Sequence, residues 1–191
     1  MDKIHVGNTP FIYPVPSVLV GTMAGGKVNY TLLGNCGIIS IHPSVIYISS
    51  RKTHCLNSGI HENGCFSVNI PSVKQVAAAD YCGLVSGKNQ DKSHVFETYF
   101  AESDKIPLIS ECPVNLSCKV IEIVSVHDME VFIAEVLSSR LSQDCLTDGK
   151  PDTKKINPLI YTMDNQYWEI GEVVEQAFSA GRGYEAKKKE V

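Results

Sequence analysis

The sequence lacks long apolar runs and lacks an excess of positive charge. A helix that crosses a bilayer needs about 20 consecutive apolar residues, and no window of this chain approaches that length. A general nucleic-acid-binding surface needs a basic face. Here 17 Lys and Arg residues are outnumbered by 21 Asp and Glu residues, which gives a net charge of −4. We therefore expect no membrane span and no nucleic-acid partner.

The chain also lacks a C-x-x-C pair and a secretory leader. Its seven cysteines are an odd, scattered set, which is typical of reduced thiols in a cytoplasmic protein, several of them acting as small apolar core residues. His61 and Cys65 have the i, i+4 spacing of zinc ligands on a helix, but Gly64 lies between them and no second ligand pair matches. The sequence thus predicts a cytoplasmic protein without a structural zinc.

What the sequence does contain is a series of short β-rich segments. β-Branched and aromatic residues gather in runs bounded by Gly, Pro and Asn, and these runs do not alternate with helices as they would around a parallel sheet. We predict strands near residues 17–22, 29–33, 45–49, 65–70, 114–123, 130–137 and 158–162. The expected fold class is mainly β, an antiparallel barrel with short helices in its crossings.

The length of 191 residues suits one domain with its own core. Residues 1–14 form a polar, Pro-containing lead-in, residues 15–170 the domain, and residues 171–191 a C-terminal segment that ends in the basic tail Lys187-Lys188-Lys189. Within the domain, the apolar alternation of residues 114–123 changes phase at Ile121. That change predicts a β-bulge in a long bent strand.

The most informative stretch is residues 28–54. Two strand-like segments flank Gly34-Asn35 and Cys36-Gly37, which are small and turn-tolerant, so that backbone amides there can approach a flat ligand. The second segment leads into a helical pattern, with Thr53 as the expected N-cap, through residues rich in hydroxyls and cations: Ser49, Ser50, Arg51, Lys52 and Thr53. Hydroxyls and cations at a helix start predict an anion site, a phosphate being the natural guest. The alternative is a capped helix beside two solvated cations.

A second stretch, residues 80–93, carries Ser86, Gly87 and Lys92 in a flexible cationic loop that can close over a phosphate or an aromatic ring. The alternative is a plain surface turn. Cysteine chemistry is a rival to a ligand site, but Cys82 next to Gly83 is more typical of a packed thiol at a helix end. His54 and Cys55 are sequence neighbours that point in different directions on a helix, which disfavours a thiolate–imidazole pair.

Taken together, these motifs resemble the flavin reductase-like family of FMN-binding split barrels, which includes the flavoredoxins. The resemblance covers about residues 15–168. It rests on five motifs in the same order along the chain: Asn29-Tyr30-Thr31-Leu32; residues 43–49 leading to residues 51–54; residues 66–71; residues 80–83 through Ser86-Gly87 to Asp91-Lys92; and residues 158–161.

The resemblance implies an antiparallel split β-barrel that binds FMN. Asn29, Tyr30, Thr31 and Leu32 would run along the flavin. The remaining residues that it implies near the cofactor are Asn35 and Cys36 beside the ring, Ser49, Ser50, Arg51, Lys52 and Thr53 around the phosphate, and Cys82, Ser86, Gly87 and Lys92 in the loop. Lys92 is a candidate for stabilising the anionic reduced ring.

This chain departs from the family pattern at three places. Asn35 stands near the position where many relatives carry a tryptophan, His42-Pro43-Ser44 replaces a D-P-P motif, and Val126-His127-Asp128 replaces a Gly-Asp-His-like turn. These differences affect the face over the ring, and the electron donor is therefore left open between NAD(P)H and an electron-transfer protein.

Two function classes follow. The first is an FMN-containing redox protein, either an NAD(P)H:flavin oxidoreductase or a flavoredoxin-like carrier, whose chemistry takes place at the flavin rather than at a catalytic side chain. The second is a non-catalytic module that holds FMN or another phosphorylated aromatic ligand. The resemblance also implies a homodimer, for which Trp168, Ile170 and Phe178 offer an apolar partner surface.

Overall fold

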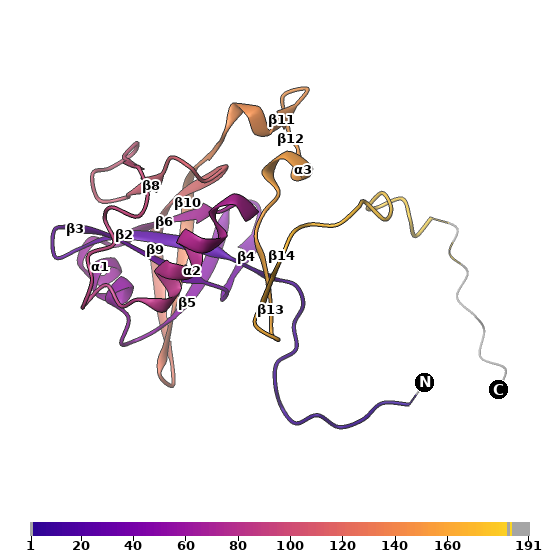
Figure 1. The fold of residues 1–191 in the computed structure, drawn as a ribbon, viewed down its shortest axis with the longest axis horizontal. Helices are drawn as coiled ribbons and strands as arrows, with labels where there is room; N and C mark the ends of the chain where they lie inside the picture. The colour runs from indigo at the N-terminus through magenta and orange to yellow at the C-terminus, as the bar shows by residue number, and fades with distance from the viewer. Residues whose placement is uncertain (1, 183, 185–191) are drawn as a thin grey trace.

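The computed structural model describes residues 2–182 and 184, and its centre is one curled antiparallel sheet (Figure 1). The seven strands lie in the order β3-β2-β6-β9-β10-β5-β4. Their bounds are β2 Val18–Ala24, β3 Lys27–Leu33, β4 Cys36–Ser40, β5 Val45–Arg51, β6 Cys65–Ile70, β9 Val114–Val126 and β10 Met129–Leu141. Each neighbouring pair is antiparallel. The mainly β, split-barrel prediction is confirmed.

Short elements surround this sheet. The helices are α1 Cys55–Asn63, η1 Val73–Gln75, α2 Val76–Leu84, η2 Gln143–Cys145 and α3 Thr153–Ile156. The remaining strands are β1 Val15–Pro16, β7 Thr98–Tyr99, β8 Leu108–Ile109, β11 Leu146–Thr147, β12 Lys150–Pro151, β13 Ile160–Thr162 and β14 Gln166–Trp168. β1 pairs with β13, and β13 pairs with β14, so the beginning and the end of the domain form one small sheet.

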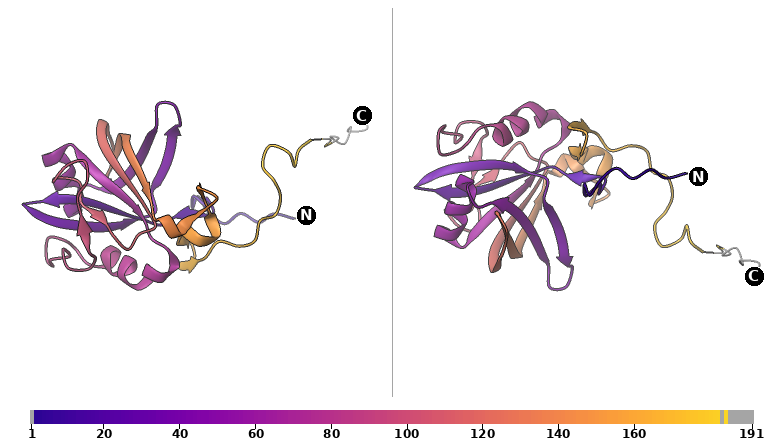
Figure 2. Two further views of the ribbon diagram at one scale, coloured as in Figure 1. Left: turned by 90° about the horizontal axis from the view of Figure 1, so that it is seen from above. Right: turned by 90° about the horizontal axis from the view of Figure 1, so that it is seen from below.

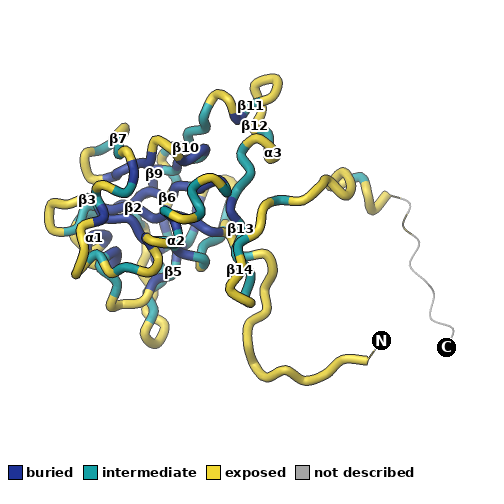
Figure 3. The backbone as a smooth tube through the Cα atoms, in the orientation of Figure 1, coloured by how far each residue is buried: buried dark blue, intermediate teal, exposed yellow. Residues whose placement is uncertain are grey.

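Strand β2 separates two cores because both of its faces are buried. Val18 and Val20 lie in a cluster with residues of α1, β5, β6 and β10, while Leu19 lies in a second cluster with residues of α2 and the following loop. Residues from opposite ends of the sheet meet in the first cluster, so the sheet curls around it. α1 and α2 therefore pack on opposite faces of β2. Figure 3 shows these buried strands at the centre of the body.

Local signals account for several element ends. The β2–β3 hairpin turns at Gly25 and Gly26, both with positive φ, where glycine avoids the Cβ clash. Helix α1 ends at Gly64, whose left-handed backbone donates its N–H to the carbonyl of Ile60. The bulge predicted at Ile121 is confirmed, because the β9–β10 register skips this residue.

Two local predictions were wrong. Cys36-Gly37 is not part of a turn but begins β4, which pairs with β5, and the ring of Tyr47 lies against Gly37. Thr53 is not the helix N-cap. The turn between β5 and α1 is closed by a hydrogen bond from the His54 N–H to the Arg51 carbonyl, and the helix begins at Cys55 with His54 as the N-cap residue.

The two chain ends leave the body on the same side (Figure 2). Nearly every residue of 2–14 and of 169–182 is exposed (Figure 3). The predicted basic tail, Lys187–Lys189, lies outside the described residues. Within the part of the chain that the structure describes, no helix is long and apolar enough to cross a membrane.

Candidate functional site

Three hollows follow strand β3 and its C-terminal end in sequence order. The first, of about 160 Å³, is lined by Thr31. The second, of about 340 Å³, is lined by residues 32–35, and the third, of about 350 Å³, by residues 34–36. The second and third share residues, among them Gly34 and Asn35. The second and third hollows thus adjoin one another at the end of β3, and the first lies beside Thr31, the residue that precedes them on the strand.

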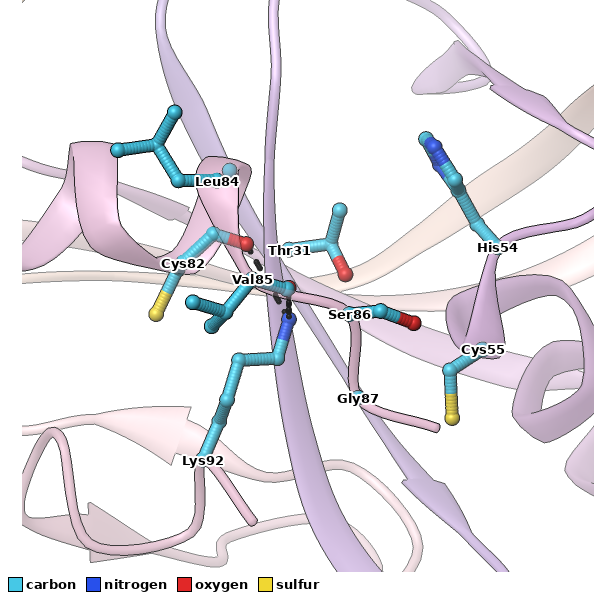
Figure 4. Close-up of a pocket in the computed structure, with 10 residues that line it drawn as sticks. Thr31, His54, Cys55, Cys82, Leu84, Val85, Ser86, Gly87 and Lys92 are labelled. Carbon is cyan, nitrogen blue, oxygen red and sulfur yellow. Dashed lines mark hydrogen bonds between the residues drawn. The ribbon is translucent and has the colours of Figure 1, made fainter. Parts of the chain in front are cut away.

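The first hollow, which we call the cationic pocket, is formed where β3, the start of α1 and the end of α2 meet. Its lining residues are Thr31, His54, Cys55, Cys82, Gly83, Leu84, Val85, Ser86, Gly87 and Lys92. In Figure 4, His54 and Cys55 lie on one side, Cys82, Val85 and Lys92 on the other, and Thr31 and Ser86 between them.

Lys92 is the buried cation of this pocket. The residue is only 2% exposed, and its ammonium group donates to the carbonyls of Cys82 at 3.2 Å and Val85 at 3.3 Å. These carbonyls belong to the last turn and the C-cap of α2, where a positive charge is favourable. Burial lowers the pKa of Lys92. An ammonium group has three N–H donors, so a third donor remains to meet a ligand.

His54 shows that the pocket is electropositive. Its Nδ1 is 3.0 Å from the hydroxyl of Ser50, which is buried on β5. The pKa of His54 is lowered, first by burial and then by the positive charges of Arg51, Lys92 and Lys88. Three positively charged side chains from two segments therefore raise the electrostatic potential at His54. An anion bound there would be stabilised.

Asn29 and Gly87 lie against one another below the pocket. A Cβ atom on Gly87 would be 2.1 Å from the Asn29 side-chain oxygen, so the loop can approach this closely only with glycine. That oxygen is buried and accepts no hydrogen bond from any residue that the structure describes. A buried acceptor normally finds a donor, so this atom fits a site that a ligand or water completes.

The structure brings together most of the residues predicted from the sequence. In the cationic pocket are Thr31, Cys82, Ser86, Gly87 and Lys92; in the second hollow Leu32 and Asn35; in the third Asn35, Cys36 and Ser49. Ser50 reaches the pocket wall through His54.

Four predicted residues lie elsewhere. The ring of Tyr30 is fully buried in the second core cluster, where its hydroxyl is 2.9 Å from that of Thr98, so only its backbone could meet a ligand. Arg51, Lys52 and Thr53 are exposed, and none of them lines the three hollows. The hollow nearest to the predicted anion site is lined instead by His54 and Cys55, at the start of α1.

Sequence reasoning missed several residues of the site. His54 belongs to the motif of residues 51–54, but neither it nor Cys55 is among the predicted ligand residues, although a position at the start of a helix is typical of anion binding. Tyr161, Met163 and Tyr167 line the second hollow from the far end of the chain. The pairing of β1 with β13 brings these residues to β3. Because this pairing is long-range, no local sequence signal indicates the contact.

Two thiols that line the hollows, those of Cys36 and Cys82, are held in their neutral form. Burial raises the pKa of Cys36 and that of Cys82 to about 11, and all seven cysteines are free. A thiolate nucleophile is therefore disfavoured at both positions. Among residues 2–182 and 184, no group of three His, Cys, Asp or Glu side chains is arranged to hold a metal ion.

Comparison with known proteins gives consistent matches. Residues 11–168 match the model of the flavin reductase like domain. A flavoredoxin structure from Methanosarcina acetivorans is 39% identical with a TM-score of 0.92, covering 95% of this chain and 98% of that one. A flavoredoxin of Desulfovibrio vulgaris (Miyazaki F) is 34% identical with a TM-score of 0.88, covering 94% and 100%. An uncharacterised protein of Archaeoglobus fulgidus is 33% identical over 119 residues, and this alignment covers 60% of this chain and 65% of the relative.

Proposed function

Because the chain belongs to the flavin reductase-like family, we propose that it is an FMN-containing redox protein that receives electrons from NAD(P)H or from a reduced protein donor. The family and the likeness to two flavoredoxins support a flavin-related redox role. The observation that carries the choice of FMN is that the cationic pocket and the second hollow lie beside consecutive residues of β3, Thr31 and Leu32, which suits a ligand with an anionic end and a flat body.

The residues present suit such a ligand. The free N–H groups at the start of α1, the hydroxyl of Ser86 and the third donor of Lys92 would hold the phosphate. Lys92 and the start of α1 line the same cavity. This supports a role for Lys92 at the phosphate or ribityl end of FMN. Arg51 and Lys88 would add charge from the rim.

The body of the ligand would lie toward the second and third hollows. Gly34 allows close approach of the backbone, and Asn35 and Cys36 border the ring end. Tyr161, Met163 and Tyr167 form an apolar wall opposite β3, which would exclude water from one face of the ring. When bound, FMN supplies hydride or single-electron transfer, and these residues supply its position and surroundings.

The test is an anaerobic absorbance spectrum of the purified protein before and after NADH, NADPH and a reduced protein donor are added in turn. Flavin bands bleached by a nicotinamide support a reductase, and bands bleached only by the protein donor support a carrier. Oxidised bands that no physiological donor bleaches would favour the binding module. A colourless protein that also fails to take up added FMN would refute the proposal.

A homodimer is part of the same proposal. Ile38 and Ile39 on the edge strand β4 are largely exposed, as are Trp168 and Phe178, the latter at 99%. Ile170 is partly exposed. Apolar side chains gathered at an unpaired sheet edge and on a terminal arm support a second copy as their cover. Sedimentation at micromolar concentration should give a dimeric mass, and a monomeric mass would contradict this assignment.

We also propose a cytoplasmic location, supported by seven cysteines that are all unpaired, five of them buried. Cell fractionation with an antibody to the protein should place it with soluble cytoplasmic markers.

A further inference from the structure

His54 occupies an unusual position in the cationic pocket. It is the N-cap residue of α1, but its side chain does not cap the helix. Instead the ring lines the pocket, with Nδ1 held 3.0 Å from the hydroxyl of the buried Ser50. The other ring nitrogen, Nε2, has no hydrogen-bond partner within residues 2–182 and 184. The ring is therefore oriented by one nitrogen and free to meet a ligand with the other.

The charges around this ring are predominantly positive. Arg51 comes from the preceding turn, and Lys88 and Lys92 come from the loop after α2. The neutral groups that share its pocket are Thr31 from β3, Cys55 and Cys82 from the two helices and Ser86 from the loop.

Carboxylates on the elements packed against His54 are engaged elsewhere. Glu130 on β10, which pairs with Ser50, accepts hydrogen bonds from Asn57 and His61. Asp91, next to Lys92 in the loop, is bonded to Lys27 and to the backbone of Ser93. No described acid is therefore bonded to the ring.

We propose that His54 is the phosphate-responsive residue of this site: uncharged in the empty pocket, it takes a proton from solvent when a phosphate monoester enters and donates from Nε2 to a phosphate oxygen. This inference rests on the proposed function and adds to it a ligand residue, a proton linkage and a basis for choosing FMN over riboflavin. A dianionic phosphate offsets two of the three neighbouring positive charges and gives the ring an acceptor, and both effects favour its protonated form.

The linkage has a defined sign. In the empty protein the pKa of His54 is below its ordinary value because of burial and the neighbouring cations. A bound phosphate raises it, so the complex binds more protons than the free protein between the two values. Affinity for FMN should therefore fall as pH rises through this window, by up to about tenfold per pH unit. Riboflavin, which has no phosphate, should show no such dependence.

The experiment is an NMR titration of the histidine side chains of the apo-protein, alone and with inorganic phosphate, FMN or riboflavin. Calorimetric titration of FMN in two buffers with different ionisation enthalpies measures the protons taken up. His54→Gln removes the titrating group, and its FMN titration corrects for the ionisation of the phosphate itself, which has a pKa of about 6. His61→Gln is the matched control, since His61 also lies on α1 but is bonded to Glu130 outside the pocket.

We expect the His54 pKa to rise with FMN and with inorganic phosphate, with a proton uptake that persists in His61→Gln and is lost in His54→Gln. If FMN binds but the His54 signal titrates unchanged, this inference is overturned and the proposed function stands. If phosphate moves the His54 signal but FMN does not bind, the anion site is supported and the FMN proposal fails. If neither ligand moves the signal and FMN does not bind, both are overturned.

Discussion

Removing the charge of Lys92 is the most direct test of the cationic pocket. In Lys92→Met a side chain of similar length and shape keeps the packing of this buried position, but the ammonium group is lost. The variant leaves the carbonyls of Cys82 and Val85 without the donor that now lies 3.2 and 3.3 Å away. On the proposed assignment it also removes one charge-assisted hydrogen bond to the phosphate of FMN.

The expected effects can be sized separately. A hydrogen bond to a charged group is worth about 1.5 to 3 kcal/mol, so the dissociation constant for FMN should rise by about 10- to 150-fold. Leaving buried carbonyls unpaired costs about 1 to 3 kcal/mol of folding free energy, which is partly offset because the cost of burying the ammonium group disappears. The apo-variant should therefore be modestly less stable but folded.

FMN affinity is measured by fluorescence titration and apo-stability by urea unfolding. Lys88→Met is the matched control, because Lys88 lies in the same loop with an exposed side chain and acts on the pocket only at a distance. The affinity of the Lys88→Met protein for FMN should change by less than about fivefold. A folded Lys92→Met protein that binds FMN as tightly as the wild type would refute the assignment of the cationic pocket to the phosphate.

Four other variants or conditions give separate checks. Gly87→Ala places a methyl group 2.1 Å from the Asn29 oxygen, so the loop must move, and FMN affinity should fall by at least about tenfold in the same titration. Arg51→Ala should weaken FMN binding by no more than about 1 kcal/mol, because the side chain is exposed, and added salt should abolish the difference. Tyr30→Phe should cost about 0.5 to 1.5 kcal/mol in urea unfolding and leave FMN affinity unchanged, since its hydroxyl bonds only within the core. The apo-protein should lose stability as pH falls below 6.5, because the unfolded His54 binds a proton more readily than the folded one, and this part of the loss should be missing in His54→Gln.

Local chemistry made much of the fold predictable. The phase change at Ile121 marked the bulge, because this signal depends only on residues of the same strand. Strand β4 escaped prediction because Cys36-Gly37 has the composition of a turn. What makes Gly37 suitable in a strand is the Tyr47 ring that lies across it, and this contact exists only after β4 has paired with β5.

For the candidate site, the sequence indicates the types of residue better than their positions. Hydroxyls and cations before α1 predict an anion site at residues 49–53, but the turn closed by the Arg51 carbonyl places the helix start beyond Thr53. The burial of Lys92 was invisible in the sequence, where it stands in an exposed, polar loop between Asp91 and Ser93. The position of Lys92 depends on the carbonyls of Cys82 and Val85 at the end of α2, which come together only in the folded chain.

The hollows along β3 are assembled from parts of the chain that are synthesised at different times. Every residue that lines the cationic pocket lies between Thr31 and Lys92, whereas the apolar wall of the second hollow needs Tyr161 and Tyr167, and the hydroxyl of Tyr167 donates to Asp80 at 2.7 Å. A chain still attached to the ribosome at residue 150 therefore holds the sequence for the charged end but not for the wall. The wall can form only after Tyr167 has been synthesised, and a protein truncated before β13 should keep the residues of the cationic pocket while losing the wall of the second hollow.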